Sequence, residues 1–148
     1  MSGLDGLVLP SRVRHARSPT LPPGVAGIAV WTPGANAEDG TVPLLVSYRL
    51  GASVVNRFQH VHSEIAVVAV AQRGEDVFAA RPLVPHGRAG AVSLSPNPAR
   101  RAMLGGFFNV DLRALFPALD ASGGRLRVHV CLAEVLSNFV DVDLGSAT

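Results

Sequence analysis

A stretch near the C-terminal end, Arg125 to Leu132, alternates between branched aliphatic residues and residues that can face water. The aliphatic residues occupy every second position, beginning at Leu126. A repeat of two places them on one face of a β-strand, as in a sheet that buries only one of its faces. The segment Phe139 to Leu144 repeats the alternation. The sequence therefore predicts two half-buried strands close to the end of the chain.

These two strands are expected to form a hairpin, because so few residues separate them. Their register must keep both aliphatic sets on one face, since a slip of one residue would turn one set outward. A five-residue loop over 133–137 predicts these cross-strand pairs: Leu132 with Asn138, Arg127 with Asp143, and His129 with Asp141. The last two pairs join cations to carboxylates, and each would contribute about 0.2–1 kcal/mol.

Further strand patterns occur along the rest of the chain. The expected strands are Val25–Trp31, Val42–Leu50, Phe58–Gln72, Val77–Leu83, Val92–Ser95 and Met103–Val110. The longest has an apolar centre, Ile65 to Val70, which suits a central strand covered on both faces. After the last, Asp111 is a favourable helix N-cap, and Pro117 limits that helix to one or two turns.

Seven or eight short strands with frequent turns predict an all-β antiparallel sandwich, with a small β-barrel as the alternative. The order of strand, short helical turn, strand and hairpin over residues 103–144 resembles the closing part of immunoglobulin-like and fibronectin-type sandwiches. This resemblance is one of architecture. It implies an immunoglobulin-like sandwich with one short helical turn, and it implies no functional residues.

The domain organisation follows from where the strand patterns begin and end. Residues 1–23 contain four prolines and a basic cluster from Arg12 to Arg17, and they lack strand alternation. We expect a flexible arm, or one that packs on a partner. Residues 24–145 would form the sandwich, and residues 146–148 a disordered tail.

Composition excludes several classes of function. All 13 basic residues are Arg, which, with abundant Ala, Gly, Pro and Val, is typical of a high-GC bacterial genome. A net charge of +2 is too small and too dispersed to indicate nucleic-acid binding. No apolar run is long enough to span a membrane, and no secretory signal is evident. The only cysteine, Cys131, cannot form an internal disulfide, which favours a cytoplasmic protein.

A candidate metal site lies within the longest expected strand. On a strand, His60, His62 and Glu64 would project from one face, and two imidazoles with a carboxylate can bind zinc or another transition metal. The competing interpretation is a polar strand end with surface histidines, in a protein that needs no cofactor. The sequence leaves both readings open.

A candidate binding surface lies on the outer face of the C-terminal hairpin. Its members are Arg125, Arg127, His129 and Phe139, next to Cys131, Val135 and Leu136. This mixture of charged, aromatic and aliphatic side chains is typical of a contact patch.

The chain lacks a Gly-x-Ser-x-Gly elbow and the glycine-rich loops that bind phosphate. We therefore expect a non-catalytic binding or accessory module that recognises a peptide or protein through a sheet edge or an outer face. A homodimer is compatible with this expectation. The alternatives are a metal-binding protein or metal-dependent enzyme, and a small barrel that binds an apolar ligand.

Overall fold

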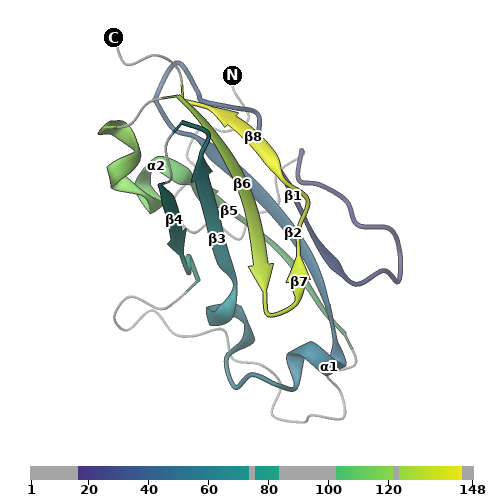
Figure 1. The fold of residues 1–148 in the computed structure, drawn as a ribbon. Coiled ribbons are helices and arrows are strands. Elements are labelled where there is room, and N and C mark those ends of the chain that lie inside the picture. The colour runs from purple at the N-terminus through teal and green to yellow at the C-terminus, as the bar shows by residue number, and fades with distance from the viewer. Residues whose placement is uncertain (1–16, 74–75, 84–102, 122–123, 145–148) are drawn as a thin grey trace.

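The fold is an antiparallel β-sandwich in a computed structural model that describes residues 17–73, 76–83, 103–121 and 124–144. Sheet A has the strand order β1 (Gly27–Trp31), β2 (Pro43–Gly51), β5 (Met103–Asp111). Sheet B has the order β4 (Val77–Ala80), β3 (Ala66–Ala71), β6 (Arg125–Leu132), with β7 (Val135–Leu136) and β8 (Val140–Asp143) both pairing with β6. In Figure 1, β3, β4 and β6 lie in front of β2 and β5. The predicted sandwich is confirmed. The barrel alternative is wrong, because the described strands form two separate sheets.

The core lies between the two sheets and consists mainly of apolar side chains at alternate positions of the strands. From sheet A come residues such as Leu44 and Phe108, and from sheet B residues such as Val67 and Val128, all at most 1 % exposed. Full burial of one such side chain stabilises the fold by about 1.5–3 kcal/mol. The predicted inward face of β6 is confirmed by its burial pattern, and β2 alternates in the same way from Val46 onward.

The strand predicted over Phe58–Gln72 is wrong in its first half. The chain leaves β2 through the short helix α1 (Ala52–Val55) and the 3-10 helix η1 (Val61–Glu64) before β3 begins. A strand over the whole predicted segment would be about 50 Å long, far longer than its neighbour β6. In η1, the amide of Ser63 donates to the carbonyl of His60 (3.0 Å), and Ile65 donates to His62 (3.3 Å). These tight turns carry the chain from sheet A to sheet B.

β3 is an interior strand of sheet B, between β4 and β6, as predicted. The expectation that both its faces are covered is wrong. Its inward residues, Val67 and Ala69, are fully buried, whereas Val68 and Val70 on the other face are only half-buried. The outer face of sheet B therefore presents aliphatic side chains to solvent.

The C-terminal hairpin has the predicted faces but not the predicted register. A two-residue turn at Ala133 and Glu134 replaces the five-residue loop, and Ala133 adopts a positive φ of 50°. The observed pairs include Leu132 with Val135, Arg127 with Asp141, and Arg125 with Asp143. Each predicted charge pair is therefore displaced by two residues. A displacement of two preserves the inward and outward faces, which is why the alternation was still assigned correctly.

One extra residue is accommodated between β7 and β8. The amide of Ser137 donates to the carbonyl of Val130 (2.9 Å), and the amide of Val130 donates to the Ser137 hydroxyl (2.8 Å). The Ser137 hydroxyl thus takes the place of a backbone carbonyl as the acceptor for Val130, at the bulge between β7 and β8. Without this bulge, β8 would present its opposite face to the core.

β5 ends at the predicted helix cap. The Asp111 carboxylate accepts from the amides of Arg113 (3.2 Å) and Val42 (2.8 Å), which fixes the start of α2 (Leu112–Leu115) and ties it to sheet A. The 3-10 helix η3 (Pro117–Ala121) follows. Residues 17–21 of the predicted arm contact their own domain, where Ser18 is buried and the Arg17 guanidinium lies 5.9 Å from the centre of the Trp31 ring. The rest of the arm up to residue 16, the strand predicted at Val92–Ser95 and the tail at 146–148 lie outside the described residues.

Candidate binding surfaces

The outer face of sheet B gathers exposed aliphatic and aromatic side chains. Val77 of β4, Leu136 of β7 and Phe139 just before β8 are 62, 54 and 53 % exposed. The cross-strand pairing places Val77 beside Val70, and Leu136 beside Cys131, on this same outward face. Three of the four exposed large hydrophobic residues in the described part of the chain therefore share one surface.

The same outer face of sheet B also carries charged side chains of opposite sign that lie side by side. The Arg127 Nε donates to Asp141 Oδ1 at 3.0 Å, and the Gln72 amide donates to the same oxygen at 3.2 Å. The hydrogen bond from Arg127 is the main reason that the pKa of Asp141 is lowered, and the positive charge of Arg125 contributes to this shift. Arg125 lies opposite Asp143 in the register of β6 and β8. The surface thus has two cations facing two carboxylates.

His129 of β6 and Phe139, just before β8, form an aromatic pair on this face. Their ring centres are 4.9 Å apart with an interplanar angle of 55°. Burial lowers the pKa of His129, so the neutral imidazole is favoured. Beside the pair, a hollow of about 430 Å³ is lined by Val70, Ala71, Gln72, Arg127 and Phe139.

The structure places the four residues predicted to bind, Arg125, Arg127, His129 and Phe139, on this one face. Their role in binding stays a prediction. Three aliphatic residues of β3 and β4 on this face were not predicted from the sequence, namely Val68, Val70 and Val77. The alternation of side chains along β3 determines which of its residues face outward. This alternation predicts their exposure only once the strand is known to begin at Ala66.

The predicted metal residues do not share a strand face. His60 is exposed, whereas His62 is buried with its ring 5.6 Å from that of Tyr48, and Glu64 forms an ion pair with Arg81 at 3.4 Å. In a 3-10 helix with three residues per turn, side chains two positions apart point in different directions. Within the described ranges, no three His, Cys, Asp or Glu residues are grouped so that they could hold a metal ion. The strand geometry on which the metal prediction depended is therefore wrong.

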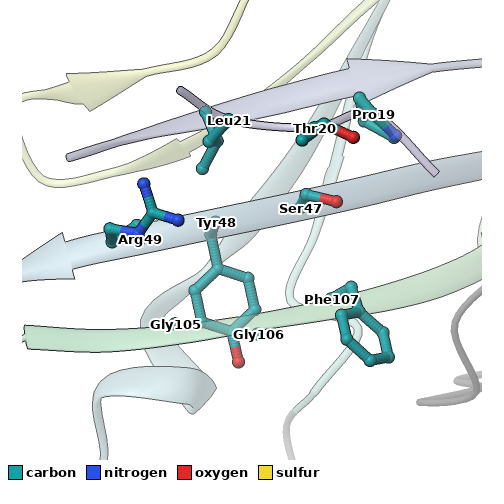
Figure 2. A pocket seen from close by; sticks show the side chains of 9 residues that line it. All are labelled: Pro19, Thr20, Leu21, Ser47, Tyr48, Arg49, Gly105, Gly106 and Phe107. Carbon is teal, nitrogen blue, oxygen red and sulfur yellow. The ribbon is translucent and has the colours of Figure 1, made fainter. Parts of the chain in front are cut away.

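A second hollow, of about 340 Å³, lies on sheet A (Figure 2). Its lining residues are Pro19, Thr20, Leu21, Ser47, Tyr48, Arg49, Gly105, Gly106 and Phe107. The Arg49 guanidinium donates to the carbonyls of Pro22 (2.5 Å) and Val25 (3.1 Å). The one cation of this hollow therefore holds the chain that leads into β1, which is a structural role.

Comparisons with known proteins do not assign this chain to a family: no family model, no curated protein and no solved structure matches it. In the parts of the chain that the structure describes, no helix has the length and apolar character to cross a membrane. Function must therefore be inferred from the side chains on the two sheet faces.

Proposed function

We propose that this protein is a non-catalytic binding module that recognises a protein or peptide partner through the outer face of sheet B. The observation that carries the proposal is the gathering of Val77, Leu136 and Phe139 on that face, each more than half exposed. Large apolar side chains that are exposed together on one face can mark interaction sites in soluble proteins. The single cysteine, Cys131, is free, which supports a reducing compartment such as the cytoplasm.

The polar groups of the face support the same function. Protein interfaces combine an apolar centre with a polar rim, and they are enriched in aromatic residues and Arg. Here the aromatic pair of His129 and Phe139 lies next to the ion pair of Arg127 with Asp141. The hollow between Arg127 and Phe139 can receive one side chain of a partner.

Within the described residues, the chemistry of these two hollows favours a binding role over catalysis. Each contains one charged side chain, Arg127 in the first and Arg49 in the second, and each of these already bonds to protein oxygens. In neither hollow does a nucleophile lie beside a general base, the arrangement that covalent catalysis needs.

The proposal is tested by selecting binders to the immobilised protein from a displayed library of random peptides. Recovered peptides are then measured against Phe139→Glu and Val77→Glu, which place a charge on the outer face of sheet B. We expect both variants to weaken binding by about tenfold or more, because a buried, unpaired carboxylate costs more than 1 kcal/mol.

The matched control is Val25→Glu. Val25 is 49 % exposed and lies two residues before β1 of sheet A. Peptides should bind this variant as they bind the unchanged protein. Recovery only of peptides that tolerate Phe139→Glu and Val77→Glu would contradict the proposal.

A further inference from the structure

The outer face of sheet B carries two columns of side chains that match row by row. β6 contributes Arg125, Arg127, His129 and Cys131. The neighbouring column consists of Asp143 and Asp141 of β8, Phe139 just before β8, and Leu136 of β7. The register places Arg125 beside Asp143, Arg127 beside Asp141, and Cys131 beside Leu136, and the rings of His129 and Phe139 are in contact. The two arginines of one column thus lie beside the two aspartates of the other, and the remaining rows of both columns are uncharged or apolar.

Such a pair of columns is complementary to itself. A two-fold axis parallel to the strands and midway between β6 and β8 exchanges the two columns when a second copy is laid face to face. We propose that the partner of this face is a second copy of the chain, which packs on it as a symmetric homodimer. The guanidinium at position 127 of each copy then lies over the carboxylate at position 141 of the other. This inference rests on the proposed function and names its partner.

Charge favours a second copy over a partner of one sign. The two arginines and two aspartates cancel within the face, and Arg127 and Asp141 already bond at 3.0 Å. A strongly basic or acidic partner would leave two like charges opposed in the contact, which costs affinity. A second copy places an aspartate opposite each arginine and an arginine opposite each aspartate. An isologous interface, in which both copies use the same surface, requires such self-complementarity.

Shape and polarity agree with this arrangement. Two sheets with the same twist pack face to face with their strands nearly aligned, as in the interior of a sandwich. The rotation places Phe139 over His129 and Leu136 over Cys131, so both exposed hydrophobic residues of these columns become covered. Because burial lowers the pKa of His129, a neutral imidazole can meet the phenyl ring without loss of charge solvation.

The test uses opposite charge reversals in the full chain, with sedimentation velocity as the measurement. The unchanged protein should show dimer formation at concentrations up to about 1 mM. Arg127→Asp and Asp141→Arg should each weaken the dimer by about 100-fold, because like charges then oppose one another across the interface. An equal mixture of the two variants should form a heterodimer, since each new carboxylate at position 127 meets a new guanidinium at position 141.

Arg57→Asp is the control, because it disrupts the exposed ion pair of Arg57 with Glu134 outside the two columns and should leave the dimer unchanged. Circular dichroism verifies that each variant is folded. The inference is overturned if the unchanged protein is monomeric throughout, if the single variants dimerise as tightly as the unchanged protein, or if their mixture associates no more tightly than either variant alone. Peptide binders sensitive to Phe139→Glu and Val77→Glu would, even then, leave the proposed function standing with a different partner.

Discussion

At the scale of single residues, the two adjacent glycines of β5 have different roles. A Cβ atom at position 106 would lie 2.5 Å from the Tyr48 hydroxyl and 2.8 Å from Cζ, whereas a Cβ at position 105 would have its nearest contact at 3.6 Å. The Tyr48 ring crosses β5 at these glycines (Figure 2) and packs against His62 and Phe108. Because the ring is 8 % exposed and held on both sides, it cannot easily move away.

We therefore expect Gly106→Ala to lower the free energy of unfolding by about 1–3 kcal/mol through overpacking. Gly105→Ala is the matched control, and it should leave stability unchanged or raise it by up to about 1 kcal/mol, because alanine restricts the unfolded chain. Urea unfolding followed by the fluorescence of Trp31, the only tryptophan, measures both effects. Equal stabilities of the two variants would show that the close approach of Tyr48 imposes no constraint.

The titration of Asp141 reports on its partner Arg127. The hydrogen bond from Arg127 lowers the pKa of Asp141 below its usual value of 3.8. A carboxyl with a lowered pKa in the folded state stabilises the fold above its unfolded pKa, and this contribution is lost as the pH falls through the folded pKa. We expect Arg127→Gln to return the pKa of Asp141 toward 3.8, as measured by carboxyl NMR. As the control, Arg57→Gln should raise the pKa of Glu134 and leave that of Asp141 unchanged. A pKa of Asp141 that stays low in Arg127→Gln would refute the role given to Arg127.

At the scale of elements, Asn138 joins the two sheets at one edge. The amide of Val30 in β1 donates to Asn138 Oδ1 (2.9 Å), and Asn138 Nδ2 donates to the carbonyl of Val30 (3.0 Å). The Asn138 side chain thus makes the two hydrogen bonds with β1 that the backbone of a neighbouring strand would otherwise make. An occupied edge is less able to pair with another chain, which favours association through a sheet face.

Removing this contact should loosen β1. We expect Asn138→Ala to lower the free energy of unfolding by about 1–2 kcal/mol and to speed amide exchange at Val30, because both backbone groups lose their partner. Asn138→Asp keeps an acceptor but loses the donor, so it too should destabilise. Asn56→Ala, at the exposed end of α1, is the control. Unchanged exchange at Val30 in Asn138→Ala would contradict this role.

Strand faces were predictable from the sequence because alternation depends only on which face is buried. Buried and less buried side chains alternate along β6 and along β2 from Val46 onward. The helix cap at Asp111 was predictable because its carboxylate accepts from a nearby backbone amide. The hairpin register was not predictable. Its tight turn uses Ala133 at positive φ, where glycine or asparagine would be the usual signal, and a bulge at Ser137 then shifts the pairing. The strand geometry that the metal prediction assumed was not predictable for a related reason, because apolar periodicity does not reveal that residues 61–64 form a 3-10 turn.

At the scale of the whole molecule, the outer faces of the two sheets differ. On sheet A, the outward residues Leu45 and Asn109 are at most 1 % exposed. On sheet B, Val77 and Phe139 remain more than half exposed. The described parts of the two outer faces therefore differ in how well their side chains are buried, an asymmetry that favours the proposed association through sheet B.

The most direct test of this account is a concentration series of amide chemical shifts recorded by NMR on the unchanged protein. We predict shifts that move with concentration in β6, β7 and β8 and stay constant in β1 and β2. The series needs no substitution, so it maps the association surface without any risk to the fold. Constant shifts throughout, or changes confined to sheet A, would contradict the claim that the outer face of sheet B binds a second copy.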